Sequence, residues 1–225
     1  MLSFIFAFCT RRIVQRAALV PLCVFAGCGT TVIPAAVSTA SPVTASPSSP
    51  VTVVVAPTTY SSALNSTSDF IGASIIHYWP MPQHNDGVPG QTSPQVLARF
   101  SSAVLNHGYQ RVIILCGTND ILDGLPDLTT ELPANLKAMA DIAKSAGIEV
   151  VLSKLPPANS NGTDLDGTVT AANNAIAQMA AQNGYLIVDY YTPLFGHPED
   201  FVDGIHPNAS GYAVMEKALS AVVLH

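Results

Sequence analysis

The chain has 225 residues, of which 48% are hydrophobic and 11% are charged, and its formal net charge is −6. This length allows one domain with appendages, and this composition excludes an intrinsically disordered protein. With nine Lys and Arg residues in all and no basic segment in the expected domain, the chain also lacks the basic face that a nucleic-acid-binding protein needs.

The N-terminal residues resemble a bacterial export signal. Three arginines precede the apolar residues 17–26, a run that is too short to span a bilayer. The residues Phe-Ala-Gly-Cys at positions 25–28 resemble the lipobox of lipoproteins, whose cysteine is lipidated and becomes the mature N-terminus. We therefore expect a lipoprotein signal peptide over residues 1–27 and a membrane anchor at Cys28, on an exported protein of the cell envelope. An ordinary signal peptide on a periplasmic or secreted protein, or a retained helix, is the alternative.

Residues 28–68 are predicted to form a tether. From Thr30 to Ser68 the chain is rich in Ser, Thr, Pro, Ala and Val and contains no charged residue. Proline removes backbone hydrogen-bond donors and favours an extended chain, so this composition is typical of a semi-rigid stalk. The folded domain is expected over residues 69–225.

Within this domain, short apolar runs alternate with helical patterns. Runs typical of strands lie at residues 70–71, 112–116, 148–152 and 185–189, and helical patterns lie at residues 92–106, 132–146, 168–183 and 209–223. Strands that are apolar throughout are typical of parallel sheets buried on both faces. The alternation predicts an α/β domain whose ligands bind beyond the carboxyl ends of the strands.

Cys116 ends one of these strands and is expected to be a buried hydrophobic residue. It is the one cysteine that remains if the signal peptide is removed and Cys28 carries lipid, so the mature chain would have no internal disulfide. No cluster of Cys and His has the spacing of a zinc site, and we expect no metal.

The residues that follow the predicted strands suit acyl transfer. Ser74 follows the first strand and Asn119 follows the strand at 112–116, while Asp203 and His206 come before the last helix. A serine attacks a carbonyl carbon when a base takes its proton; His206 suits that role, with Asp203 orienting its imidazole. The backbone N–H of Ser74, a glycine N–H and the Asn119 amide are candidate donors to the oxyanion.

Four blocks at these strand ends resemble the motifs of the SGNH (GDSL-type) hydrolases. They are Gly-Ala-Ser at residues 72–74, Asn-Asp-Gly-Val-Pro-Gly-Gln-Thr at 85–92, Gly-Thr-Asn-Asp at 117–120 and Asp-Gly-Ile-His-Pro-Asn at 203–208. Each block alone is common, but four blocks in order, each at a strand end, are specific. The resemblance extends from about residue 70 to 223.

This resemblance implies a flavodoxin-like three-layer α/β/α sandwich with a parallel sheet of about five strands. It implies a serine esterase that hydrolyses carboxylic esters, with short acyl or O-acetyl esters favoured, and that uses no cofactor. The family's four named residues fall on Ser74, Gly90, Asn119 and His206. With Asp203 these give a catalytic triad of Ser74, Asp203 and His206 and an oxyanion hole of Ser74, Gly90 and Asn119. Its substrate would be a small-molecule, glycan or lipid ester.

Two features depart from the family's pattern. Ala73 occupies the place of the family's Asp, a supporting residue, and a short segment at residues 80–84 predicts a short second strand with an open rim near Gly90. Gly87, in the same loop, is the alternative oxyanion glycine. The competing functions are a non-catalytic module that binds a glycan or a lipid, and an acyltransferase, which the same site could be if water were excluded.

Several side chains near the predicted site could have either a functional or a structural role. Tyr78 and Trp79 either line the site or pack in the core, and His77 and His84 either contact substrate or serve the turns beside them. His197 lies in a polar loop and is the first alternative to His206 as the base.

Overall fold

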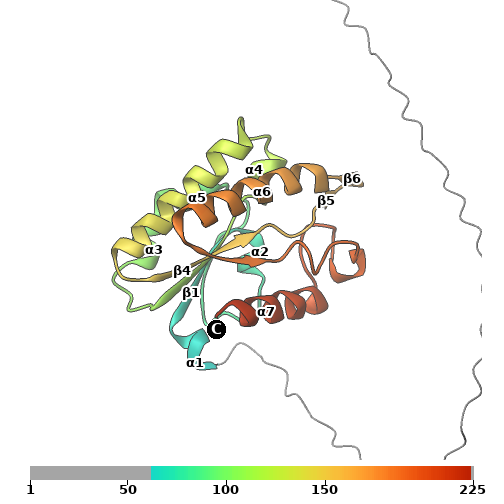
Figure 1. Ribbon diagram of the computed structural model, residues 1–225. Coiled ribbons are helices and arrows are strands. Elements are labelled where there is room, and N and C mark those ends of the chain that lie inside the picture. Colours follow the sequence, from blue (N-terminus) through green and yellow to red (C-terminus); the bar gives the residue numbers. More distant parts are fainter. Residues whose placement is uncertain (1–61, 224–225) are drawn as a thin grey trace, which may run out of the picture. The chain divides into compact units, whose positions relative to one another are not determined.

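The structure, a computed structural model, describes residues 62–223. Its centre is a sheet of five strands that pair in parallel throughout, in the order β2-β1-β3-β4-β7 (Figure 1). The strands are β1 (Ser68–Gly72), β2 (His84–Gly87), β3 (Arg111–Leu115), β4 (Glu149–Lys154) and β7 (Leu186–Asp189). This order is that of a flavodoxin-like sheet, which confirms the expected fold.

Helices cover both faces of the sheet, which gives three layers. On one face lie the long helices α3 (Ser93–Val104), α5 (Leu128–Ser145) and α6 (Asp166–Asn183). On the other face lie α7 (Ala209–Val223) and the short α2 (Ser74–His77), which are joined by a hydrogen bond of 2.8 Å from the Tyr212 hydroxyl to the Ile75 carbonyl (Figure 1). The small elements are α1 (Ser62–Ser66), α4 (Thr118–Leu122), η1 (Pro198–Asp200) and a hairpin of β5 (Asn159–Ser160) with β6 (Thr163–Asp164).

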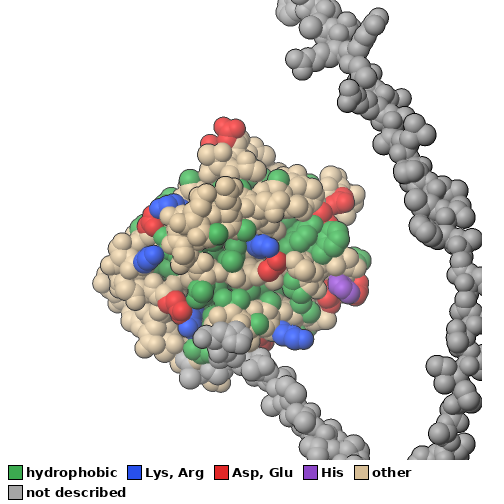
Figure 2. Space-filling model, in the orientation of Figure 1, with side chains coloured by type: hydrophobic (Ala, Val, Ile, Leu, Met, Phe, Trp, Pro, Cys, Tyr) green, Lys and Arg blue, Asp and Glu red, His purple; other side chains and the backbone are tan. Residues whose placement is uncertain are grey.

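The sequence pattern explains how these layers pack. The central strands bury apolar residues on both faces, and α3 buries Val96, Phe100 and Val104, which follow each other at one-turn spacing. The start of α3 is fixed by the Gln95 side chain, which accepts a hydrogen bond from the Thr92 backbone N–H at 2.9 Å. On the face shown in Figure 2, acidic and basic side chains are sparse and interspersed, with no basic patch.

Some element boundaries differ from the prediction. Helix α5 begins at Leu128 rather than at residue 132. Proline is typical of the first turn of a helix, so Pro133 favours the later start in the sequence, but in the structure it lies inside the helix. Strand β4 continues past its apolar run to Lys154, whose ammonium group pairs with the Asp189 carboxylate on the neighbouring strand at 2.8 Å. The β5–β6 hairpin is absent from the prediction, since two residues per strand carry no periodicity.

The N-terminal boundary of the domain also differs. Residues 62–68, assigned above to the tether, belong to the fold: Asn65 is buried, and its side-chain amide donates to the Met81 carbonyl at 2.7 Å. The rest of the tether, the signal peptide and Cys28 lie outside the described residues and stay predictions. No helix within residues 62–223 combines the length and the apolarity that crossing a membrane requires.

The buried carboxyl group of Asp69 should give the free energy of unfolding an unusual dependence on pH. This carboxyl is fully buried in β1, and its pKa is raised to about 7, first by burial and then by the charge of Asp86. Between about pH 4 and pH 7 the folded protein therefore binds more protons than the unfolded chain, so the free energy of unfolding falls as the pH rises. From pH 5 to pH 8 we expect a loss of about 2–3 kcal/mol, at about 1.4 kcal/mol per pKa unit.

Urea denaturation at several pH values measures this effect. Asp69→Asn should flatten the decline, whereas Asp123→Asn, a change at an exposed position, should leave it as in the wild type. Equal slopes for the wild type and Asp69→Asn would rule out this carboxyl as the source.

Candidate active site

Ser74 occupies a sharp turn from β1 into α2. The turn depends on Gly72, because a Cβ there would lie 1.9 Å from the Leu115 carbonyl oxygen on β3. Ser74 is the first residue of α2, and Asn119 lies in α4 directly after β3. The order of strands along the chain reverses between β1 and β3, and in such sheets the crevice beyond this point is the usual ligand site.

Three of the predicted side chains form one hydrogen-bonded chain. The His206 Nε2 atom lies 2.8 Å from the Ser74 Oγ atom, across 132 residues of sequence, and His206 Nδ1 lies 2.7 Å from Asp203 Oδ2. The other carboxylate oxygen of Asp203 accepts the backbone N–H groups of Ile205 and His206. Burial is the largest single influence on the pKa of Asp203 and raises it, but the hydrogen bonds from His206 and Ile205 together outweigh burial and leave the pKa below its usual value, so the carboxylate stays ionised.

The loop that carries Asp203 and His206 is supported on two sides. The Val202 N–H donates to the His206 carbonyl at 2.8 Å, which closes the loop on itself. At Gly204, φ is +81° and a Cβ would lie 2.5 Å from the Asn159 carbonyl oxygen, so this residue has to be glycine for the loop to rest on β5. After the loop, the Asn208 side chain accepts the N–H groups of Ser210 and Gly211 and begins α7.

The loop of residues 85–92, called the glycine loop below, contacts both Asn119 and the turn that carries Ser74. The Val88 N–H donates to the Gly72 carbonyl at 3.1 Å, and the Asn119 amide donates to the Gln91 carbonyl at 2.9 Å. An amide nitrogen carries two hydrogens, so this bond orients Asn119 and leaves its second N–H for a ligand. Gly90 is exposed, has φ of +79° and has no atom within 4 Å of a Cβ built there.

Gly87 has a different use, because a Cβ there would lie 2.2 Å from the His77 nitrogen. Its lack of a side chain lets β2 pack on α2, which leaves Gly90 as the exposed glycine of the loop.

This geometry agrees with a known family. A model of the GDSL-like lipase/acylhydrolase family matches residues 44–214, which is most of the chain. The protein belongs to this family. At the level of its family, this GDSL-like protein is therefore an ester hydrolase. A search of curated protein sequences finds no match.

Solved structures agree with this assignment. A GDSL-like lipase from Bacteroides thetaiotaomicron is 28% identical, with a TM-score of 0.64 over 70% of this chain and 87% of that one. A lipolytic protein of the G-D-S-L family from Veillonella parvula is 23% identical, with a TM-score of 0.60 over 70% and 98% of the two chains. A catalytic mutant of an acetylxylan esterase from Geobacillus stearothermophilus is 18% identical, with a TM-score of 0.59 over 69% and 92%. The last two share the fold.

Arg99 is a supporting residue of this GDSL-like site that sequence analysis missed. Its guanidinium donates to the carbonyls of Gly72 at 3.0 Å and Asp86 at 2.7 Å, and to the Gln91 side chain at 2.7 Å. It therefore joins the serine turn to the glycine loop. The sequence pattern of α3 contains a hint to this role, because Arg99 lies beside Val96 and Phe100 at the apolar stripe of the helix, where a charged residue is unexpected.

Asp120 ties the Asn119 turn to α3. Its buried carboxylate accepts the Ser93 backbone N–H at 2.8 Å and the Ser93 hydroxyl at 2.5 Å, and Asn135 donates to that hydroxyl at 3.0 Å. These bonds, with those of Arg99, hold the Asn119 turn and the glycine loop in place although Ala73 carries no carboxylate.

The structure separates the aromatic residues and histidines whose roles the sequence left open. Tyr78 is 57% exposed and lines a cavity beside His206, whereas Trp79 is 2% exposed and packs against Tyr212 in the core. His77 and His84 each contact a backbone carbonyl, of Gly87 and Ser66 respectively.

His197 pairs with the Glu199 carboxylate at 3.0 Å on the surface and takes no part in the chain of Ser74 and His206. Cys116 is buried, as expected, and burial raises the pKa of its thiol. Among residues 62–223, no group of three or more His, Cys, Asp or Glu is arranged to hold a metal ion.

Proposed function

We propose that the protein is a serine esterase that hydrolyses carboxylic esters, with short acyl and O-acetyl esters as its preferred class. The observation that carries the proposal is the continuous hydrogen-bonded chain from Ser74 Oγ through the His206 ring to Asp203. In this proposal Ser74 is the nucleophile, His206 is the general base and acid, and Asp203 holds the imidazole in the tautomer whose Nε2 accepts the serine proton.

The reaction would proceed in two steps, acylation of Ser74 and hydrolysis of the acyl-serine. Ser74 Oγ attacks the carbonyl carbon as His206 takes its proton, and the oxyanion receives hydrogen bonds from the N–H groups of Ser74 and Gly90 and from the Asn119 amide. His206 then gives the proton to the departing alcohol, which leaves an acyl-serine. Water attacks this ester, His206 again takes a proton, and the acid departs as the proton returns to Ser74.

Two measurements on the purified protein test the proposal. Release of p-nitrophenol from its acetyl ester and from esters of longer acids reports turnover, and mass spectrometry after treatment with a serine-directed phosphonate reports the nucleophile. We expect turnover of the short ester and one phosphonate per chain, on Ser74, with none on Ser74→Ala. If the wild type neither labels nor turns over while it binds a glycan or a lipid, the protein is a binding module; transfer of the acyl group to an added alcohol in preference to water indicates an acyltransferase.

We further propose that the protein is anchored in the bacterial envelope by lipid on Cys28, as the lipobox-like residues 25–28 support. Two acyl chains on one residue give stable membrane binding. The wild type grown with radioactive palmitate should take up label, and Cys28→Ser should take up none and keep its signal peptide. A wild type without label would replace the anchor with simple secretion.

A further inference from the structure

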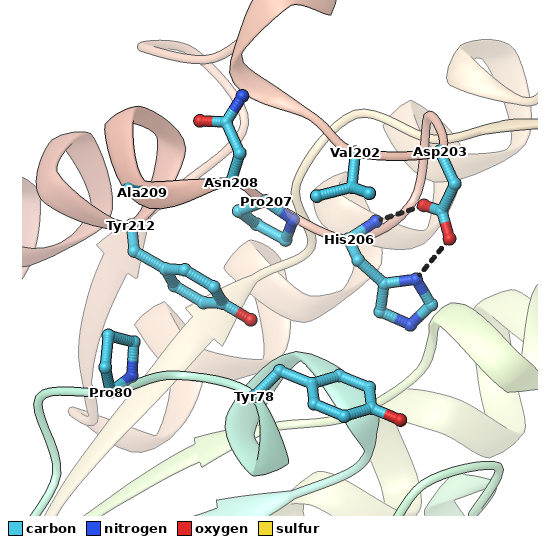
Figure 3. Close-up of a pocket in the computed structure, with 9 residues that line it drawn as sticks. All are labelled: Tyr78, Pro80, Val202, Asp203, His206, Pro207, Asn208, Ala209 and Tyr212. Carbon is cyan, nitrogen blue, oxygen red and sulfur yellow. Dashed lines mark hydrogen bonds and ion pairs between the residues drawn. The ribbon is translucent and has the colours of Figure 1, made fainter.

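A cavity of about 480 Å³ opens directly beside His206 (Figure 3). It lies between the segment after α2, the loop that carries Asp203 and His206, and the first turn of α7. Most of its wall is apolar: Tyr78, Pro80, Val202, Pro207 and Tyr212 contribute rings and hydrocarbon. Val202 is 75% exposed and Tyr78 is 57% exposed, so both side chains are accessible to a ligand in the cavity.

The polar side chains of this wall are already engaged. Both Asp203 oxygens are bonded to the His206 loop, and the Tyr212 hydroxyl donates to the Ile75 carbonyl. The Asn208 amide donates to the Glu199 carbonyl, and its oxygen accepts two N–H groups of α7. Within residues 62–223, the Tyr78 hydroxyl has no hydrogen-bonding partner, so it is the polar side-chain group of this wall that is left for a ligand, whereas His206 Nε2 lies 2.8 Å from Ser74 Oγ.

This chemistry selects the kind of ligand. A sugar ring carries a hydroxyl on most of its carbons, and each hydroxyl that leaves water without a partner costs binding free energy. A hydrocarbon or aryl group has no such requirement and gains from burial against the two tyrosine rings. The cavity therefore fits an apolar group and not a polyhydroxylated one.

The position of the cavity selects which part of an ester this group belongs to. His206 Nε2 has to reach the oxygen of the departing alcohol to give it a proton. In the proposed mechanism the oxyanion is bound by Gly90 and Asn119, and neither of these residues lines the cavity. The alcohol part of the ester would therefore start with its oxygen at His206 and extend from there into the cavity.

From these observations, and resting on the proposed esterase function, we infer that the cavity is the alcohol subsite and that the enzyme prefers short-acyl esters of apolar alcohols, such as aryl-substituted or alkyl alcohols. Tyr78 and Val202 are then specificity-determining residues that contact the alcohol part.

Two isomeric esters test the assignment. Benzyl acetate carries the phenyl ring on its alcohol, methyl phenylacetate carries it on its acid, and methanol and benzyl alcohol are similar leaving groups. We expect kcat/KM for benzyl acetate to exceed that for methyl acetate by roughly tenfold to a hundredfold, as burial of a ring implies. Methyl phenylacetate should show no such gain over methyl acetate.

Variants locate the effect in the cavity. Tyr78→Ala, and separately Val202→Asp, should reduce the benzyl-to-methyl ratio at least about fivefold. The matched control is Phe195→Ala, which also removes an exposed aromatic ring, at 53% exposure, but away from the cavity wall, and which should keep the wild-type ratio. Thermal unfolding of each variant checks that it is folded.

Binding without turnover separates the two proposals. Saturation-transfer NMR with benzyl alcohol should detect contact with the wild type, weakened in Tyr78→Ala, and methyl β-xyloside should show none. A preference for methyl phenylacetate, or equal ratios in the wild type and both cavity variants, overturns the alcohol subsite while the esterase function stands. If no ester is turned over and benzyl alcohol still binds, the esterase function fails and the alcohol assignment fails with it.

Discussion

Replacing His206 with alanine should lower kcat for a p-nitrophenyl ester by at least about 10³-fold. The Ser74 hydroxyl, whose oxygen now lies 2.8 Å from His206 Nε2, would lose the base that takes its proton in the attack. Asp203→Asn should cost a similar or smaller factor, because the imidazole would remain but lose the carboxylate that fixes its tautomer. Steady-state kinetics with a sensitive fluorogenic ester measures both.

His197→Ala is the matched control. This histidine also pairs with an acidic side chain, but it lies on the surface and makes its contact to Glu199, so kcat should stay at the wild-type value. If His197→Ala were the slow variant and His206→Ala kept its activity, the base would have to be reassigned.

Replacing Asn119 with alanine should lower kcat by about 10²–10³-fold and leave KM almost unchanged. In the proposed mechanism the amide meets a charge that exists only in the transition state, so its loss should raise the barrier without weakening substrate binding. The bond of the Asn119 amide to the Gln91 carbonyl fixes the amide before substrate arrives. Asn119→Asp should be no better than Asn119→Ala, because an ionised carboxylate has no N–H to donate.

Asn174→Ala provides the comparison for this change. Asn174 is exposed on α6, so its removal should leave both constants as they are. A rise in KM for Asn119→Ala at constant kcat would make Asn119 a substrate-binding residue instead.

The sheet could be predicted from the sequence because its inner strands are continuous apolar runs. Strand β3 is the clearest case, since four of its five residues are fully or nearly fully buried hydrophobic residues. The pattern marks strand β1 only at residues 70–71, because this strand begins with Ser68 and Asp69, polar residues that are buried all the same. Periodicity registers hydrophobicity and cannot register a polar residue that the fold buries.

The candidate site was predictable for a different reason. Ser74, Asn119 and His206 each follow or precede an element end, where a parallel sheet gathers residues that are distant in sequence. The supporting contacts follow from three-dimensional packing and not from pattern. Tyr78 and Trp79 are neighbours of similar chemistry, yet the turn after α2 exposes one beside His206 and buries the other against Tyr212.

The proposed nucleophile and the proposed base come from opposite ends of the domain's sequence, and this separation would govern when activity can arise. Ser74 follows the first strand of the sheet, whereas His206 precedes the last helix. A partly synthesised chain that ends before His206 therefore lacks the proposed base, and its α2 also lacks the Tyr212 hydroxyl that binds the Ile75 carbonyl. Non-local contacts cost loop-closure entropy, so we expect this one to form late in folding, and recovery of ester hydrolysis after dilution from urea would then report when the two ends of the domain's sequence come together.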